Sequence, residues 1–314
     1  MNDIKSIVIY GPGVMGASMA QIFAQYGYNT TLLGRTDKSI EKAVNLMEIN
    51  QESLVKAGHL TKEESDRIKK SINFTTDYSC FNNAQYVIET IIEDMEIKKD
   101  FYRYISDVAP KNCIIVTNTS GLSVSEMAKE LKYPERFAGM HWINPPHLVP
   151  LIEIIKGEHT SDETLETVKN VCESIHKKAV VVKKECAGFI FNRLQYAILR
   201  EAAYIAKNGW ADIEDIDDVV RFGLGMRYAC IGPFRVADIG GLDTFDKISR
   251  YLVPDLSAEE NIPLLTETVC EKGGHGVKNG LGFYDYSNGK DKEAIVERDK
   301  RFLEILDKFY KDYL

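Results

Sequence analysis

IKSIVIYGPGVMGASMAQIFAQ, residues 4–25, joins an apolar, β-branched run to a glycine turn and then to apolar residues at helical spacing. The turn has the spacing G-x-G-x-x-G, which in this strand–turn–helix context is typical of dinucleotide binding. The three glycines permit the tight turn, the approach of a pyrophosphate and the close packing of helix on strand. Free N–H groups at the start of the helix favour phosphates. An ordinary strand-to-helix turn is the alternative. The strand, spacing and helix agree, so we expect a nucleotide site at Gly11, Gly13, Val14, Met15 and Gly16.

The composition is ordinary for a soluble globular protein and excludes several classes. The chain has 314 residues, enough for two domains, with 44% hydrophobic and 27% charged residues. A net charge of −8 argues against nucleic acid or an anionic membrane as partner and leaves a small-molecule substrate. No signal peptide precedes the first strand and no run of 18 apolar residues occurs, so we expect a cytoplasmic protein. The six cysteines have no ligand-like spacing, which predicts reduced thiols and no metal site.

The second predicted strand, residues 29–33, ends in Gly34-Arg35-Thr36, where a dinucleotide domain recognises the adenine ribose. A carboxylate here bonds the 2′-hydroxyl of NAD, whereas a nearby arginine accommodates the 2′-phosphate of NADP. Gly34 occupies the expected acidic position, and Thr36-Asp37 is better explained as the cap of the next helix. Arg35 is either a phosphate ligand or a solvated surface charge. The sequence favours NADP(H) bound by Arg35, with NAD(H) as the alternative.

The remaining pattern predicts two domains. A helical pair over residues 38–70 is followed by apolar strands at 86–89, 113–117 and 179–182, with a helix at 101–108. This alternation predicts an α/β, Rossmann-like, doubly wound and mostly parallel sheet over residues 1–183, whose ligands lie at the carboxyl ends of the strands. Residues 184–314 show helical spacing without strands, including helices at 189–208 and 300–313, which predicts an all-α domain. Its long apolar helix packs either within that domain or in a dimer interface.

Residues 137–155 combine a histidine with a carboxylate in an apolar strand. A short strand ends at His141, a proline-rich turn follows, and Glu153 lies in the middle of the next strand. A carboxylate in such a strand is costly to bury unless it is paired. A neighbouring carboxylate orients an imidazole and favours its protonated form. His141 can then take a hydroxyl proton as an alcohol is oxidised, or return it as a ketone is reduced. A structural His–Glu hydrogen bond without chemistry is the alternative.

These residues resemble the 3-hydroxyacyl-CoA dehydrogenase family, and the resemblance covers essentially the whole chain. Three motifs fall in family order. They are NTS at 118–120, the run from RFAG at 136–139 through NP at 144–145 to Glu153, and AGFIFNR at 187–193.

The resemblance implies roles for individual residues. His141 is the catalytic base, Glu153 its orienting partner, and Ser120 and Asn192 hold the substrate oxygens. Implied cofactor contacts are Glu93, Lys98, Ser120, Asn144 and Lys278, of which Glu93 and Lys98 would otherwise be ordinary exposed helix charges. The family's dimers use the C-terminal domain, so a homodimer formed through residues 184–314 is expected.

Two departures from the family pattern affect the cofactor and the substrate. Gly34 stands where family members commonly have an aspartate. Short-chain acyl-CoA members carry lysines in the first projecting helix, where this chain has Ile49 and Ser53, leaving Lys42 and Lys56 as weaker candidates. The stretch HWINPPHLVP, residues 141–150, resembles an outlying subgroup that oxidises non-CoA alcohols. That subgroup includes the pyridoxine-degradation hydroxymethyl-pyridinecarboxylate dehydrogenase and the related lambda-crystallin and gulonate dehydrogenase.

Three functions remain. The leading one is hydride transfer between a nicotinamide cofactor and a 3-hydroxyacyl-CoA such as 3-hydroxybutyryl-CoA, whose oxidised form is acetoacetyl-CoA. The second is a dehydrogenase of a non-CoA hydroxy acid or hydroxymethyl-pyridine carboxylate. The third is a non-catalytic dinucleotide-binding protein. The set of Ser120, His141, Glu153 and Asn192 favours an enzyme.

Overall fold

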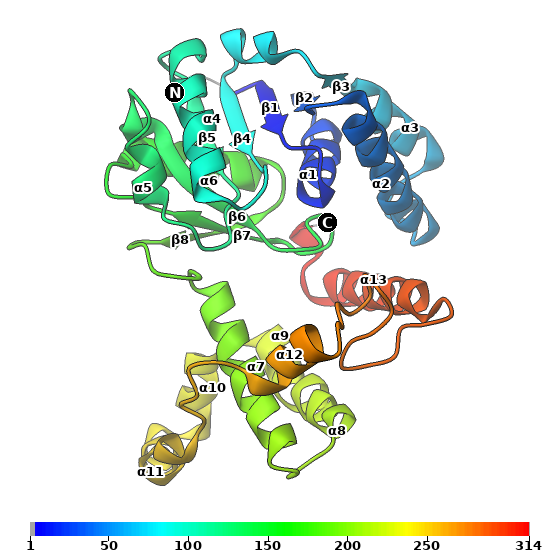
Figure 1. Ribbon diagram of the computed structural model, residues 1–314, viewed down its shortest axis with the longest axis vertical. Helices are drawn as coiled ribbons and strands as arrows, with labels where there is room; N and C mark the ends of the chain where they lie inside the picture. Colours follow the sequence, from blue (N-terminus) through cyan, green and yellow to red (C-terminus); the bar gives the residue numbers. More distant parts are fainter. Residues whose placement is uncertain (1–3, 314) are drawn as a thin grey trace. The chain divides into compact units, whose positions relative to one another are not determined.

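The computed structural model describes residues 4–313, which form two compact units (Figure 1). The first comprises the chain up to Asn192 together with the segment from Phe302 onward, and the second is Arg193–Arg301. The domain boundary expected at 183–184 stays a prediction. The end of the last helix belongs to the first unit, because Leu303 and Leu306 are buried in its core. The outermost residues of the two expected domains, 1–3 and 314, lie outside the described part.

A twisted eight-stranded sheet forms the centre of the first unit, in the order β3-β2-β1-β4-β5-β6-β7-β8. Its strands are β1 (Ser6–Tyr10), β2 (Asn29–Leu33), β3 (Ile72–Thr75), β4 (Tyr86–Glu89), β5 (Ile114–Thr117), β6 (Phe137–Trp142), β7 (Leu151–Ile155) and β8 (Lys178–Val182). The pairs are parallel except for β6 with β7. The predicted doubly wound, mostly parallel sheet is confirmed. The short edge strand β3 was not expected, because its INFT sequence carries too few apolar residues.

Helices cover both faces of this sheet. One core holds Ile7 and Ile9, and it is closed by α1 (Val14–Gln25), α2 (Asp37–Lys56), α3 (Lys62–Ser71), α6 (Asp162–Ser174) and the end of α13 (Lys290–Phe309). The other core holds Val8 and Tyr10, under α4 (Met95–Val108) and α5 (Val124–Ala128). Successive residues of a strand point to opposite faces, so β1 contributes to both cores. Coverage of both faces explains the nearly continuous apolar strands.

Capping side chains set where several helices begin. Thr36 caps α2 and Thr61 caps α3, each in a reciprocal arrangement with the residue three positions later. Asp94 caps α4, since its Oδ1 accepts a hydrogen bond from the backbone N–H of Ile97 at 3.0 Å. This helix therefore begins at Met95, before the expected start at 101, and its first turns include Lys98.

The second unit is helical apart from isolated bridges within residues 276–285. It contains most of α7 (Phe191–Lys207), then α8 (Ile213–Asp218), α9 (Met226–Cys230), α10 (Pro233–Gly240), α11 (Leu242–Leu252), α12 (Pro263–Thr266) and the start of α13. Gly209 has φ +66° just beyond the end of α7, as expected for a helix stop. The last helix begins at Lys290, earlier than the expected 300. Within residues 4–313, no helix has the length and apolar character that membrane crossing requires.

Lys177 holds the connection between β6 and β7. Its ammonium donates to the carbonyl oxygens of Pro146 at 2.8 Å and Val149 at 3.0 Å, and it lies 5.9 Å from the centre of the Trp142 ring. Burial lowers the pKa of Lys177 to about 7. One buried side chain thus fixes both sides of the turn that contains the expected cofactor residue Asn144.

We predict that the contribution of Lys177 to stability rises with pH. Its pKa is about 7 in the folded chain and about 10.4 in an unfolded one. Below the folded-state pKa, Lys177 is charged in both states, so folding carries the full free-energy cost of burying an ammonium. Between the two values the unfolded chain binds more protons, so stability rises with pH by on the order of 1 kcal/mol per unit. In urea unfolding between about pH 7 and 9.5, the free energy of unfolding of the wild type should rise relative to that of Lys177→Met.

The exposed neighbour Lys178 supplies the control, because Lys178→Met should keep the pH trend of the wild type. Identical pH trends for Lys177→Met and wild type would contradict the prediction.

Candidate active site

The glycine turn after β1 has the geometry that the sequence predicted. Gly11 has φ +118°, and a Cβ there would lie 2.3 Å from the carbonyl oxygen of Thr90. A Cβ on Gly16 would lie 2.0 Å from the carbonyl oxygen of Gly11, so α1 can pack this closely only with glycine. At Gly13, by contrast, no atom lies within 4 Å of an added Cβ. The backbone is therefore open at the position where a pyrophosphate would approach.

A pocket of about 420 Å³ opens beside this turn, lined in part by Tyr10, Gly13, Arg35 and Lys42. Gly13 caps α1 without a side-chain hydrogen bond, so the first N–H groups of the helix, from Val14 onward, can bind an anion. The glycine turn, the N-terminus of α1 and the cationic rim of the pocket together fit a dinucleotide. The nicotinamide of such a cofactor would supply the hydride acceptor.

Side chains of the first turn of α2 crowd position 34, at the end of β2. A Cβ on Gly34 would lie 2.8 Å from Oγ of Ser39 and 2.9 Å from Cγ1 of Ile40, both in the first turn of α2. Arg35 is exposed on the rim of the pocket, and it forms no ion pair within the described part of the chain. Its guanidinium is thus available to a ligand.

Glu89, at the end of β4, is a fully buried carboxylate with four donors. It accepts hydrogen bonds from Lys98 Nζ at 2.6 Å, Tyr102 Oη at 2.5 Å, Thr117 Oγ1 at 2.7 Å and the N–H of Ile91 at 2.8 Å. Burial and the charge of Glu89 raise the pKa of Tyr102, so its hydroxyl stays a donor. The sequence reasoning missed Glu89, although a carboxylate ending an apolar strand carries the same signal as Glu153.

The buried ion pair supports the loop after β5. Lys98 also lies 3.4 Å from Oε2 of Glu93, whose Oε1 accepts hydrogen bonds from Thr119 Oγ1 at 2.6 Å and the N–H of Ser120 at 2.7 Å. Asn192 Nδ2 donates to the carbonyl oxygen of Ser120 at 3.0 Å. The structure therefore brings together Glu93, Lys98, Ser120 and Asn192. Lys98 is fully buried, unlike an ordinary helix charge.

His141 and Glu153 face each other directly across the antiparallel pair β6–β7. The imidazole Nδ1 lies 2.8 Å from Oε2 of Glu153, and both residues are buried. An ionised carboxylate only accepts hydrogen bonds, so Nδ1 is the donor and Nε2 is left as the acceptor. The other oxygen, Oε1, accepts hydrogen bonds from the backbone N–H groups of Ile190 and Phe191, each at 2.9 Å. The pair has the arrangement of an oriented general base.

The remaining predicted cofactor contacts are Asn144 and Lys278. Asn144 is exposed in the turn after β6. That strand end is held by Asn118, whose Oδ1 accepts a hydrogen bond from the N–H of Trp142 at 2.9 Å. Lys278 belongs to the second unit, in the turn between Gly276 and Leu281. The roles of Asn144 and Lys278 as cofactor contacts stay predictions.

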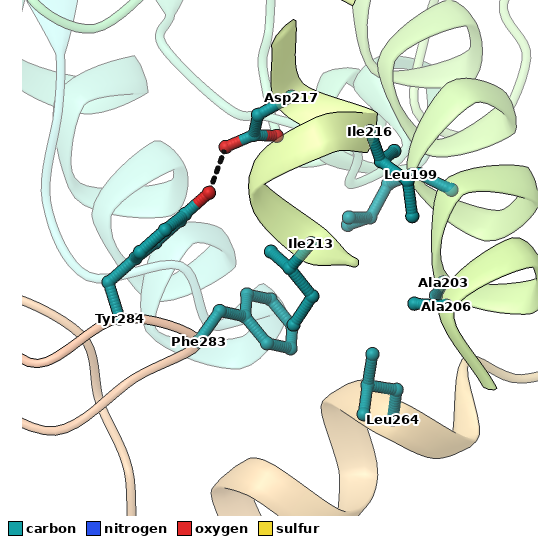
Figure 2. Close-up of a pocket in the computed structure, with 10 residues that line it drawn as sticks. Leu199, Ala203, Ala206, Ile213, Ile216, Asp217, Leu264, Phe283 and Tyr284 are labelled. Carbon is teal, nitrogen blue, oxygen red and sulfur yellow. Dashed lines mark hydrogen bonds between the residues drawn. The ribbon is translucent and has the colours of Figure 1, made fainter. Parts of the chain in front are cut away.

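The second unit has an apolar pocket of about 80 Å³ of its own (Figure 2). Phe283 lies beside Ile213 of α8, and Leu264 of α12 closes the opposite side. The one hydrogen bond drawn there runs from Tyr284 Oη to Asp217 Oδ2 at 2.8 Å. Burial and then this bond raise the pKa of Tyr284, which keeps its hydroxyl a donor. The described lining of this pocket is apolar except for Asp217 and Tyr284, which bond to each other.

A helix-capping glycine turn beside a nucleotide-sized pocket, together with a buried imidazole–carboxylate pair, defines a nicotinamide-dependent oxidoreductase. Comparison with known families specifies the class. The NAD-binding domain of 3-hydroxyacyl-CoA dehydrogenases matches residues 6–186, and their C-terminal domain matches residues 188–286. The chain belongs to the 3-hydroxyacyl-CoA dehydrogenase family, as its motifs had indicated.

Individual relatives fall into two groups. The chain is 33% identical over 303 residues to the 5-formyl-3-hydroxy-2-methylpyridine 4-carboxylate 5-dehydrogenase of Mesorhizobium japonicum, covering 96% of this chain and 97% of that protein. A crystal structure of an enzyme of that activity, described as an NAD+-dependent dismutase, superposes with a TM-score of 0.88 at 34% identity, covering 96% and 97%. The 3-hydroxybutyryl-CoA dehydrogenase of Clostridioides difficile is 34% identical over 283 residues, covering 90% of this chain and 99% of that enzyme.

We predict that removing one partner of the buried Glu89–Lys98 pair strongly destabilises the fold. Lys98→Met should lower the free energy of unfolding by about 3–5 kcal/mol, because the buried Glu89 carboxylate keeps its three hydrogen-bond donors but loses its compensating positive charge. Lys99, the next residue of α4, makes a 3.3 Å pair with the exposed Glu96 and serves as the matched control. Lys99→Met should cost less than about 1 kcal/mol. Urea unfolding measures both, and equal losses would refute the distinction.

Proposed function

We propose that the protein oxidises an alcohol, or reduces the corresponding carbonyl, with His141 as the general base. The observation that carries this proposal is the hydrogen bond from Nδ1 to Glu153, which leaves Nε2 free to accept the hydroxyl proton. As that proton moves to His141, the hydrogen on the same carbon leaves as hydride to the nicotinamide. In the reverse direction the imidazolium returns the proton. The ionised Glu153 stabilises the imidazolium in both directions.

Ser120 and Asn192 are proposed to hold the substrate oxygen. The N–H of Ser120 donates a hydrogen bond to Glu93, and the carbonyl oxygen of Ser120 accepts one from Asn192. These bonds fix the loop and leave the hydroxyl group of Ser120 for a ligand. A hydroxyl donor that is already held in place, as proposed for Ser120, can stabilise a developing oxyanion without rearrangement during the reaction.

We propose a small carboxylate without CoA as substrate, of the kind named for the Mesorhizobium japonicum relative, which matches the chain over nearly its full length. The surface of α2 supports this choice, because Ile49 is exposed and Ser53 is uncharged where CoA phosphates would need cations. A 3-hydroxyacyl-CoA is the second candidate. It is favoured by the 3-hydroxybutyryl-CoA dehydrogenase relative and by the exposed Lys42 and Lys56 on the same helix.

We propose NADP(H) as the preferred cofactor, although the description of the family's domain and that of one related structure name NAD. Arg35 can donate two parallel hydrogen bonds to a phosphate, and Ser39 and Lys42 line the same pocket. Position 34, directly after β2, carries no carboxylate to repel a 2′-phosphate or to bind the ribose of NAD.

A homodimer formed through the second unit is also proposed. Helices α10 and α11 have no buried residue in the described chain, although α11 is amphipathic. Phe234 is 88% exposed, and Ile239 and Tyr251 are exposed on the same two helices. Exposed apolar side chains gathered on two consecutive helices support association with a second copy of the chain.

The reaction and the substrate are tested together by following nicotinamide absorbance. We expect higher kcat/KM with 5-formyl-3-hydroxy-2-methylpyridine 4-carboxylate than with acetoacetyl-CoA. On the better substrate His141→Ala should lose roughly two to four orders of magnitude in rate with unchanged cofactor affinity. Glu153→Gln should lose less, and the exposed His159→Ala serves as control. Near-normal turnover by His141→Ala would overturn the assigned base. A preference for acetoacetyl-CoA would overturn only the substrate class.

Cofactor preference is tested by steady-state kinetics with NADPH and NADH. In wild type, kcat/KM should be higher with NADPH. Arg35→Ala should lower that value roughly ten- to a hundred-fold, as expected for a charged hydrogen bond, and should leave the value for NADH nearly unchanged. Lys38→Ala, on the exposed first turn of α2, is the matched charge control. A higher kcat/KM with NADH in the wild type would refute the proposal.

A further inference from the structure

The turn between β8 and α7 contains a strained residue beside the catalytic pair. Gly188 has φ +72° and Phe189 has φ +53°, both in the left-handed region. Glycine adopts that region freely, but a bulky aromatic residue rarely does. Phe189 is fully buried, so packing holds it in this conformation. Strained residues are concentrated at functional sites, where the strain maintains a particular geometry. Phe189 lies beside the His141–Glu153 pair.

The backbone after Phe189 supplies two donors to Glu153. The N–H groups of Ile190 and Phe191 both reach Oε1 at 2.9 Å, while Oε2 accepts from His141. Left-handed residues redirect the chain sharply, and here the redirected chain points two successive N–H groups at one oxygen. Hydrogen bonds thereby hold both oxygens of the Glu153 carboxylate.

The ring of Phe189 lies against the other member of the pair. Its centroid is 5.5 Å from that of the His141 imidazole, and the two planes meet at 60°. The hydrogen bond to Glu153 fixes one edge of the imidazole but still permits the ring to tilt about that contact. A buried phenyl ring on the imidazole limits this tilt and so limits the direction of Nε2.

We propose that Phe189 is a positioning residue for the His141–Glu153 pair. Its left-handed backbone directs two N–H groups to Glu153, and its ring sets the plane of the imidazole. The inference rests on the proposed role of His141 as the base. Phe189 touches neither the cofactor nor the reacting carbon in this assignment, and it acts only through the pair.

Kinetics of Phe189→Leu and of the flexible alternative Phe189→Met test the proposal. Because misplacement of a reacting group by about 1 Å can cost up to roughly a hundred-fold, kcat should fall by about ten- to a hundred-fold. The KM values for substrate and cofactor should stay within about twofold. Phe81, another fully buried phenylalanine, lies in the same core cluster and supplies the control Phe81→Leu. A kcat for both Phe189 variants equal to that of Phe81→Leu would overturn the proposal.

The His141→Ala background separates positioning from a general loss of structure. If Phe189 acts through the imidazole, Phe189→Leu should cause no further loss once the imidazole is gone. The same fold-loss in both backgrounds would mean that Phe189 is only structural, and would overturn the proposal.

The ¹⁵N spectrum of His141 gives a readout that does not depend on turnover. Wild type and Phe189→Leu should both show the Nδ1–H tautomer, because the Glu153 hydrogen bond sets it. In Phe189→Leu the Nε2 resonance should shift and broaden, because the imidazole can tilt once the phenyl ring is gone. An Nε2 resonance identical to that of wild type would overturn the positioning role. A shifted and broadened resonance, together with near-normal turnover of His141→Ala, would support positioning of the pair while overturning the proposed function.

Discussion

The antiparallel pairing of β6 with β7 is the constraint on which the catalytic geometry depends. In a sheet whose other pairs are parallel, this reversal places His141 directly opposite Glu153. The period of a strand is two residues, so a slip of one position would send one partner to the other face of the sheet. The register is held from outside by Lys177, which binds two carbonyl groups of the connecting turn.

Two buried carboxylates organise neighbouring ends of the sheet in different ways. Glu89 is compensated by an ammonium, two hydroxyl groups and one N–H, whereas Glu153 is compensated by an imidazole and two N–H groups. Such groups are costly to desolvate, so they are weak evidence of stabilisation by themselves. Their common effect is a fixed geometry, because each donor tolerates little displacement. The loop bearing Ser120 and the imidazole of His141 are both held by these networks.

Much of the fold was accessible from local patterns. The glycine turn, the sheet class and the capped helices follow from spacing within short stretches, where steric and hydrogen-bonding rules act between neighbours in sequence. The pairing of His141 with Glu153 was also predictable, since a carboxylate within an apolar strand needs a nearby partner. The edge strand β3 and the return of the last helix to the first unit were not, because both depend on contacts between distant segments.

The sequence by itself determined which chemical groups the protein has and roughly where the chain turns. It identified a dinucleotide turn, a histidine with a carboxylate, and an arginine next to the glycine that occupies the expected acidic position after the second strand. Only the tertiary structure decided that Lys98 is buried in contact with Glu89 and Glu93, that the first turn of α2 crowds Gly34, and that Phe189 is strained against His141. These outcomes depend on which segments meet in the folded chain. Burial, steric room and backbone strain are set by such neighbours, and local sequence does not specify them.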